Sequence, residues 1–414
     1  MKNVTKCRSC GNDSLPIVLD LGETPLANAL QDSAHETPTV APLVVAQCDS
    51  CSLVQLTTEV DREVLFGDYV YFSSYSDTTL ASARTLVERH VEEAQLTSEH
   101  LVIELASNDG YLLKHYVELG IPVLGVEPAA NIAEVARAAG VPTVCEFFDD
   151  AVAARLVEEQ GHATVVHANN VLAHVSDLDG FVRGIRTLLS PEGVAYIECP
   201  YLCDLVDGVE FDTIYHEHLC YFSLRSLTAL FGERGLTIVD VERLPVHGGS
   251  LRLRVARSTA LQDHTIVQTA SQAQHVEALQ RTETALGVGR VDYMDPLAER
   301  IVSLRDSLKS LLDELPNGSV AAYGASAKST TLLHAFGLGR DRIDWIADRS
   351  PMKQGKHTPG TGIPIVAPEQ LASEMPDFTL LLCWNFATEV LAQQQAYRDA
   401  GGKFIIPIPE LRVV

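Results

Sequence analysis

The chain is short of positive charge: 31 Lys and Arg stand against 55 Asp and Glu, for a formal net charge of −24. Proteins that bind a nucleic-acid backbone present a basic face to it, so this composition argues against nucleic acid as a partner. An anionic small molecule can still bind where Lys, Arg or backbone N–H groups gather locally. We therefore look for a small-molecule site with its own local donors.

Long hydrophobic runs are also absent. No uninterrupted apolar stretch approaches the roughly 18 residues of a membrane-spanning helix. The first residues, Met1-Lys2-Asn3-Val4, have no signal-peptide core. We expect a cytoplasmic protein that does not contact membranes and acts as a monomer. At 414 residues the chain is long enough for two or three domains.

Nine cysteines are present, and four of them form the pairs Cys7-x2-Cys10 and Cys48-x2-Cys51. Small turn-forming residues accompany each pair, as in zinc knuckles. We expect these four thiolates to hold one structural Zn²⁺ in a reducing compartment, which would keep a small N-terminal module together. A redox CxxC pair and an iron–sulfur centre are the alternatives. The remaining cysteines are scattered at Cys145, Cys199, Cys203, Cys220 and Cys383.

From about residue 80, helical and strand-like segments alternate. A stretch rich in Ala, Leu and Glu over 80–96 is followed by short apolar runs at 101–105, 123–127, 164–168 and 193–198. This alternation is typical of a doubly wound parallel sheet, which binds its ligands at the carboxyl ends of the strands.

The glycine pattern G-x-G-x-x-G of nicotinamide-binding domains is missing after the first of these strands. An acid stands near the end of that strand instead, a turn of small residues follows, and a second acid ends the next strand. Such a turn lets the backbone approach the methionyl part of S-adenosylmethionine, and the second carboxylate can accept both ribose hydroxyls. Two solvated surface acids are the alternative. The residues expected to bind this cofactor are Glu104, Ala106, Asn108, Gly110, Glu127 and Asn169.

The densest group of reactive side chains is the run Tyr215-His216-Glu217-His218. It can supply a base, a group that orients the base and a donor for a developing oxyanion. The two histidines are two residues apart, whereas zinc proteases need the spacing H-E-x-x-H, so we exclude that class. In an extended segment both histidines share one face. A structural, satisfied histidine is the alternative for His216.

Two further motifs lie nearer the C-terminus. The segment His247-Gly248-Gly249-Ser250-Leu251-Arg252 indicates either a backbone approached by a ligand or an ordinary hairpin turn. Leucines at three- and four-residue steps over 297–315 predict a long amphipathic helix. A second strand-turn-helix unit then begins, and its residues 324–330 can hold phosphates through N–H groups, hydroxyls and Lys328. The Walker spacing is missing, and a structural βα turn is the alternative.

These motifs together resemble the zinc-containing sugar C-methyltransferases that act on thymidine-diphosphate (dTDP) linked keto sugars of antibiotic pathways, the group of the tetronitrose, kijanose and noviose enzymes. The resemblance spans essentially the whole chain. It implies an α/β fold with a zinc-binding module over 1–75, a central class I methyltransferase domain with a doubly wound sheet over 76–256, and a Rossmann-like domain over 257–414 that contributes to sugar-nucleotide binding. Besides the paired cysteines, the segments that carry it are 24–28, 69–75, 104–110, 215–223, 247–252 and 323–331.

The resemblance also implies roles for individual residues. His218 matches the family's base, with Tyr215 and Glu217 beside it. His174, after the fourth strand, and Tyr69, from a tyrosine-rich segment, would line the same pocket. The residues expected to bind the substrate are Tyr71, His247, Gly249, Ser326, Lys328 and Asn385.

The chemistry of carbon methylation is consistent with these roles. A sugar ring carbon becomes nucleophilic only next to a carbonyl, so we expect C-methylation of a dTDP-linked 4-keto-deoxyhexose at C-3′ after enolisation by His218. Glu217 would fix the tautomer of His218, and Tyr215 or His174 would face the enolate. The alternatives are methylation at C-5, a nicotinamide-dependent sugar-nucleotide dehydrogenase or epimerase, and a non-catalytic sugar-nucleotide-binding protein.

Overall fold

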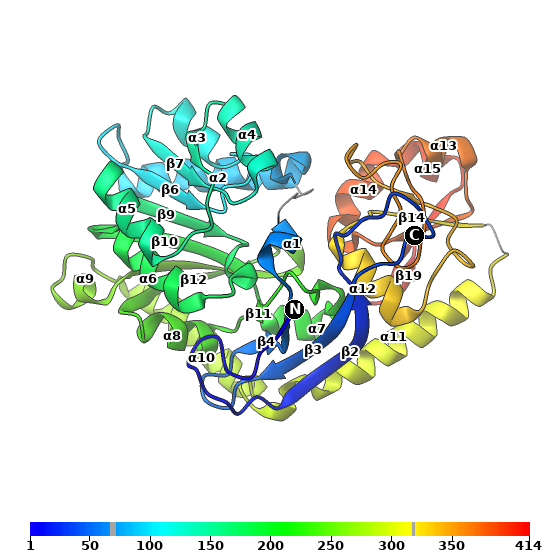
Figure 1. Ribbon diagram of the computed structural model, residues 1–414, viewed down its shortest axis with the longest axis horizontal. Helices are drawn as coiled ribbons and strands as arrows, with labels where there is room; N and C mark the ends of the chain where they lie inside the picture. Colours follow the sequence, from blue (N-terminus) through cyan, green and yellow to red (C-terminus); the bar gives the residue numbers. More distant parts are fainter. Residues whose placement is uncertain (67–71, 317–318) are drawn as a thin grey trace.

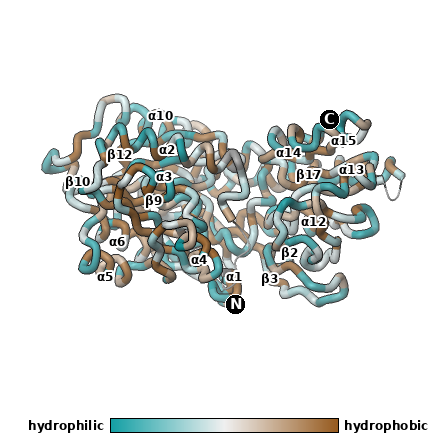
Figure 2. Tube along the Cα trace, turned by 90° about the horizontal axis from the view of Figure 1, so that it is seen from above, coloured by the Kyte–Doolittle hydropathy of each residue, from teal (hydrophilic) through white to brown (hydrophobic). Residues whose placement is uncertain are grey.

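The computed structural model describes residues 1–66, 72–316 and 319–414. Two α/β lobes, one central and one C-terminal in the sequence, lie side by side, and an N-terminal sheet fills the angle below them (Figure 1). Seen from above, hydrophobic segments run through the inside of both lobes (Figure 2). No helix in these ranges is long and apolar enough to cross a membrane.

The N-terminal module is built on an antiparallel sheet of four strands in the order β11-β4-β3-β2. Three strands come from the N-terminal residues, whereas β11 (Cys220–Tyr221) comes from the middle of the chain and pairs with β4. A small β1–β5 pair and α1 complete the module. Its elements are β1 (Lys2–Asn3), β2 (Ile17–Pro25), β3 (Val40–Gln47), β4 (Val54–Leu56), β5 (Thr58–Glu59) and α1 (Arg62–Phe66).

The central lobe contains a seven-stranded sheet in the order β12-β13-β10-β9-β6-β7-β8. The five strands from β10 to β8 are parallel, and β13 runs antiparallel to both β10 and β12. β6 and β7 are buried along their whole length, which explains why both read as continuous apolar runs. The strands are β6 (Val102–Leu105), β7 (Val123–Val126), β8 (Thr143–Val144), β9 (Ala163–Asn169), β10 (Leu189–Pro200), β12 (Leu236–Leu244) and β13 (Ser250–Arg257).

Helices and short 3-10 turns join these strands. The Ser76 side chain accepts the N–H of Thr79 and so begins α2, close to where the helical composition starts. The elements are η1 (Ser73–Tyr75), α2 (Asp77–Ala94), α3 (Leu113–Glu118), α4 (Ala130–Ala138), α5 (Asp150–Gln160), η2 (Leu172–His174), α6 (Leu178–Leu188), α7 (Leu202–Asp207), η3 (Phe211–Thr213), α8 (Leu224–Gly232), η4 (Val246–Gly248) and α9 (Ser258–Gln262).

Two long helices lead to the C-terminal lobe. α10 (Ala270–Leu286) packs on β12 and α8 of the central lobe, and η5 (Val291–Met294) follows it. α11 (Asp295–Asp313) passes beneath β2 and reaches α12 (Figure 1). The predicted amphipathic helix is confirmed here, because Leu297, Ile301, Leu304 and Leu308 are buried. The domain divisions at 75 and 256 stay predictions.

The C-terminal lobe has a six-stranded sheet in the order β16-β15-β14-β17-β18-β19. In chain order this is 3-2-1-4-5-6, the order of a doubly wound nucleotide-binding fold, with only the last strand antiparallel. The expected α/β fold is thereby confirmed in both lobes. The elements are β14 (Val320–Tyr323), α12 (Ala327–Phe336), β15 (Ile346–Ala347), β16 (Ile365–Val366), α13 (Gln370–Glu374), β17 (Phe378–Leu381), η6 (Trp384–Phe386), α14 (Ala387–Gln393), α15 (Gln395–Asp399), β18 (Lys403–Ile406) and β19 (Arg412–Val413).

Candidate functional site

The four paired cysteines converge in the N-terminal module. Their sulfur atoms all lie within 4.8 Å of one another, with Cys7 Sγ 3.4 Å from Cys51 Sγ and Cys10 Sγ 3.5 Å from Cys48 Sγ. Four thiolates at Zn–S distances of ~2.3 Å stand ~3.8 Å apart in a tetrahedron, so the cluster fits a closed structural zinc site. Such a site leaves no position for a substrate.

The edge of the central sheet carries the two acids expected at the cofactor. Glu104, near the end of β6, is buried, and its pKa is raised well above the usual range by burial and by the charges of Asp109 and Glu127. Glu127 follows β7, and burial raises its pKa as well. The Glu127 carboxylate accepts the N–H groups of Asn108 and Ala129, each at 2.9 Å. Neither acid is a solvated surface residue.

The turn between these acids is strained. Ala106 and Asn108 have φ values of 52° and 50°, in the left-handed region that favours glycine. Gly110 also has a positive φ, and a Cβ there would lie 2.9 Å from a methyl carbon of Val141. The missing side chain of Gly110 therefore makes room for the Val141 side chain. Asn169, the last residue of β9, reaches the same edge of the sheet.

A segment that precedes α2 closes over this turn. The N–H of Ser73 donates to Asn108 Oδ1 at 2.8 Å, and the N–H of Ser74 donates to Asp109 Oδ2 at 3.1 Å. The end of the tyrosine-rich segment therefore touches the expected cofactor turn. Tyr69 and Tyr71 lie outside the described residues.

The reactive run folds as a turn, so the two histidines do not share the face that an extended segment would give them. The N–H of His218 donates to the Tyr215 carbonyl, so the side chains of Tyr215 and His218 meet on one side. His216 points elsewhere and donates from Nε2 to the Ala41 carbonyl at 3.2 Å. Burial lowers the pKa of His216. His216 is therefore held against the N-terminal module, away from the side chains of Tyr215 and His218, and its buried Nδ1 has no hydrogen-bond partner among the described residues.

The hydrogen bonds of His218 define its tautomer. Nδ1 lies 2.8 Å from the Thr213 carbonyl oxygen, which can only accept, so Nδ1 carries the proton. Nε2 lies 2.8 Å from the Tyr215 hydroxyl and keeps its lone pair in the neutral imidazole. The His174 ring stands edge-on to His218 with centroids 4.8 Å apart, and burial lowers the pKa of His174 to about 4. The rings of His174, Tyr215 and His218 thus form one cluster.

Glu217 has a different position from the one expected. Its carboxylate accepts a 2.7 Å hydrogen bond from Asn28 Nδ2 of the N-terminal module, and the Thr213 carbonyl, not Glu217, holds Nδ1 of His218. Burial raises the pKa of Glu217 to about 7, while the Asn28 amide and the charge of Lys353 lower it. Glu217 therefore lies where the module, the central lobe and the C-terminal lobe meet.

The paired glycines form the turn of the β12–β13 hairpin, which is the simpler of the two interpretations. A Cβ on Gly248 would lie 2.3 Å from a Glu210 carboxylate oxygen, and one on Gly249 would lie 2.3 Å from Asp204. Side chains of the same lobe therefore take the space beside both glycines. η4, which includes His247, lies against η6, which includes Asn385. Ligand contacts of His247 and Gly249 stay predictions.

The start of α12 brings Lys328 toward this region. Lys328 Nζ lies 4.6 Å from the centre of the Trp384 ring. Lys328 Nζ and the Ser326 hydroxyl are both buried, and neither has a hydrogen-bond partner among the described residues. The Thr330 hydroxyl, at the end of this loop, instead donates to the Ala27 carbonyl at 3.0 Å. Two side-chain donors of the predicted phosphate loop, Lys328 and Ser326, therefore remain available.

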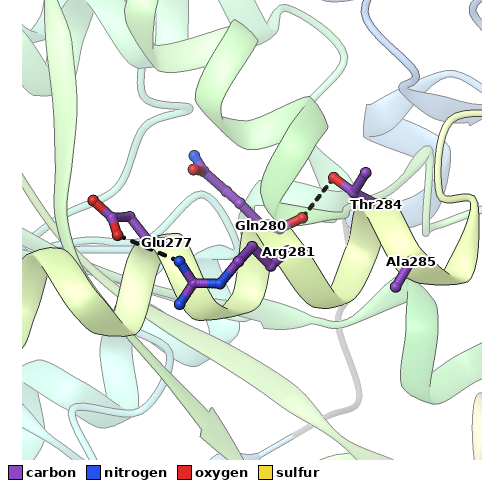
Figure 3. A pocket seen from close by; sticks show the side chains of 5 residues that line it. All are labelled: Glu277, Gln280, Arg281, Thr284 and Ala285. Carbon is purple, nitrogen blue, oxygen red and sulfur yellow. Dashed lines mark hydrogen bonds and ion pairs between the residues drawn. The ribbon is translucent and has the colours of Figure 1, made fainter.

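A hollow on the surface of α10 is separate from these residues. It is lined by one face of the helix, where Arg281 pairs with Glu277 (Figure 3). Within the described ranges, no expected site residue lines it.

Comparisons with known proteins agree with this geometry. Three family models match consecutive parts of the chain: a zinc binding domain over 7–66, a methyltransferase domain over 80–241 and a C-methyltransferase C-terminal domain over 245–409. The chain is 37% identical to the C-methyltransferase NovU of Streptomyces niveus, over 100% of this chain and 98% of the relative. The chain belongs to the C-methyltransferase family. As a member, this C-methyltransferase uses S-adenosylmethionine, and its four cysteines form the zinc site.

Solved structures resemble parts of this C-methyltransferase. The magnesium protoporphyrin IX methyltransferase of Synechocystis PCC 6803, solved with bound cofactor, matches 48% of this chain and 89% of its own at 14% identity, with a TM-score of 0.35. The CcbJ methyltransferase of Streptomyces caelestis matches 42% of this chain and 89% of its own at 17% identity, with a TM-score of 0.32.

Sequence reasoning missed three residues that contact the reactive turn of this C-methyltransferase. Thr213 acts through a backbone carbonyl, which leaves no trace in residue type. Asn28 is 189 residues from Glu217, and Lys353 comes from the C-terminal lobe. Of the three, only Asn28 could have been noticed in the sequence, because it ends the segment 24–28 that carries part of the family resemblance.

Proposed function

We propose that this C-methyltransferase methylates C-3′ of a dTDP-linked 4-keto-deoxyhexose, with His218 as the base that forms the enolate. One observation carries the proposal: the Thr213 carbonyl holds the Nδ1 proton of His218, which leaves a basic Nε2 beside the Tyr215 hydroxyl. A neutral imidazole in a fixed tautomer is the group that general-base catalysis near neutral pH needs.

The proposed reaction moves one proton before a carbon–carbon bond forms. His218 Nε2 takes the proton from C-3′, and the C–H electron pair shifts to the C-4′ carbonyl oxygen. In the complex, the Tyr215 hydroxyl turns from Nε2 to the developing enolate oxygen, which frees the lone pair; His174 is the second donor available there. Base and donors of this kind each contribute about 10²–10³ in rate. S-adenosylmethionine supplies the electrophilic methyl group.

Charge and position support a nucleotide-linked substrate. Lys328 and Ser326 offer buried donors at the start of α12, as a diphosphate group requires. α12 also packs on η3, which ends two residues before Tyr215, and Thr331 of α12 donates to the Ile214 carbonyl at 2.9 Å. A diphosphate near Lys328 is thus on the same side of the C-terminal lobe as the base turn. In this arrangement the sugar extends from the C-terminal lobe toward His218.

Hydrogen exchange in deuterated water tests the proposal directly. Wild-type protein with S-adenosylhomocysteine and a dTDP-4-keto-6-deoxyhexose should exchange the C-3′ hydrogen, and methylation with labelled S-adenosylmethionine should give a C-3′ product by NMR. His218→Ala should abolish exchange while both ligands still bind, because the base acts on the transition state. His35→Ala, at an exposed histidine, is the matched control. Exchange that persists in His218→Ala and vanishes in Tyr215→Phe would reassign the base to Tyr215.

Two further outcomes would replace the proposal. Exchange and methylation at C-5 would move the reacting carbon. Calorimetric binding of reduced nicotinamide cofactor without binding of S-adenosylmethionine would favour a dehydrogenase or epimerase.

A further inference from the structure

The segment that holds the base is itself held by the C-terminal lobe. Residues 211–214 include η3 and the Thr213 carbonyl that accepts the Nδ1 proton of His218. Phe336 of α12 packs on Phe211 with ring centroids 5.2 Å apart. Thr331 donates to the carbonyl of the last residue of the segment. Trp384 of the C-terminal lobe makes the third contact with this segment, at Asp212.

Trp384 reaches the centre of this segment. Its indole N–H donates to Asp212 Oδ2 at 2.7 Å, and both side chains are buried, with exposed fractions of 8% and 0%. A hydrogen bond to a carboxylate away from water is one of the stronger polar contacts in a protein, and it constrains both groups. Asp212 directly precedes Thr213, so the indole acts one peptide unit from the carbonyl that orients His218.

The face of the same indole supports a second group. Lys328 Nζ lies 4.6 Å from the ring centroid, within the range of a cation–π contact. The edge of Trp384 thus contacts the segment that orients the base, and its face contacts the ammonium expected at the diphosphate. One rigid side chain links the two ends of the proposed substrate site.

We propose that Trp384 is a positioning residue for enolisation, which through Asp212 keeps the Thr213 carbonyl in place for His218 and through its ring holds Lys328. This inference rests on the proposed function, because it takes His218 as the base. Trp384 itself needs no contact with the reacting atoms. The two contacts of Trp384 are separable by mutation.

Trp384→Phe separates them, because it removes the N–H and keeps an aromatic face over Lys328. We expect C-3′ hydrogen exchange and kcat to fall together by about tenfold, the loss of one such hydrogen bond. The KM for the dTDP-4-keto-6-deoxyhexose should stay within about twofold of wild type, because the ring still supports Lys328. Trp384→Ala, which removes both contacts, should lower exchange and also raise that KM.

Two controls separate positioning from general damage. Trp345→Phe makes the same change at the second tryptophan of the chain and should leave exchange unchanged. Asp212→Asn keeps an acceptor for the indole and should retain more exchange than Asp212→Ala. Zinc content, S-adenosylmethionine affinity and thermal unfolding report whether each variant is folded.

The outcomes distinguish this inference from the proposed function. If the wild type and Trp384→Phe exchanged the C-3′ hydrogen at the same rate, the positioning role would be overturned and His218 would remain the base. A rise in KM without loss of kcat in Trp384→Phe would also overturn it, because the indole would then serve the nucleotide alone. No exchange in the wild type would overturn the proposed function and this inference with it.

Discussion

Asn28 of the zinc-binding module donates a 2.7 Å hydrogen bond to Glu217, the neighbour of the proposed base. The module therefore contributes a side chain to the reactive turn, in addition to its metal. A second contact supports the same loop, because Thr330 of the C-terminal lobe donates to the carbonyl of Ala27. The position of Asn28 thus depends on two parts of the chain that are far apart in sequence.

Replacing this amide should change the titration of its partner. In Asn28→Ala the Glu217 carboxylate loses a donor, so its pKa should rise further above about 7 and the acidic limb of the rate–pH profile should move to higher pH. We expect turnover at neutral pH to fall about tenfold. Asn3→Ala makes the same change at an exposed site of the module and should have no effect. An unshifted limb would show that the bond is only structural.

Glu217 should also make stability depend on pH. Its pKa is about 7 in the folded chain against a reference value of 4.5, so the folded state binds more protons between these two values. Stability should therefore fall as pH rises from about 4.5 to 7, by roughly 3 kcal/mol for this group, and level off above. Urea unfolding of wild type and Glu217→Gln across this range measures it. If the free energies of unfolding of the two proteins differed by the same amount at every pH, the raised pKa of Glu217 would be contradicted.

The zinc site gives a prediction for metal removal. Metal analysis should find about one zinc per chain, and Cys48→Ser should destabilise the module, because the metal supplies much of its folding free energy. Turnover should then fall with little change in S-adenosylmethionine affinity, since Asn28 is displaced and the central sheet is not. Cys145→Ser, outside the cluster, is the control. Full stability of the metal-free protein would defeat the idea.

The patterns that the sequence predicted well are the ones set by burial. β6, β7 and the leucine face of α11 were found because continuous apolar runs and three- and four-residue steps reflect packing directly. The four cysteines were found because their spacing is dictated by metal geometry.

The details of the reactive run depend on contacts that sequence does not encode locally. Tyr215 to His218 form a turn, in which Thr213, Asn28 and Ala41 each accept or donate one hydrogen bond, and the longest of these contacts joins residues 189 positions apart. Local pattern shows which residue types gather there. It does not show which backbone carbonyl accepts which proton.

The cofactor edge can be tested at Glu127. Glu127→Ala removes an acceptor for the ribose hydroxyls and also releases the N–H groups of Asn108 and Ala129, so affinity for S-adenosylmethionine should fall by about 1.5–3 kcal/mol. Calorimetry measures this directly. Glu134→Ala, at an exposed acid of α4, should bind normally. Equal affinity in both variants would remove Glu127 from the cofactor site.

Two buried acids near Lys328 predict how nucleotide binding depends on pH. Burial raises the pKa of Glu210 to about 8 and that of Asp212 to about 6, and the Lys328 charge acts in the opposite direction on both. As pH rises through these values each acid gains a negative charge close to the ammonium expected to hold the diphosphate. Affinity for an anionic nucleotide should therefore fall as pH rises from about 6 to 8, by roughly tenfold.

The ligand for this measurement is dTDP-glucose, because the charge of its diphosphate diester does not change between pH 6 and 8. In Glu210→Gln the part of the decline near pH 8 should disappear, since the group that titrates there is gone. Glu314→Gln, at an exposed acid, should keep the wild-type dependence. Lys328→Met should bind weakly at every pH. If wild-type affinity were constant from pH 6 to 8, the diphosphate would have to lie away from Lys328, and the nucleotide would be bound by other residues of the C-terminal lobe.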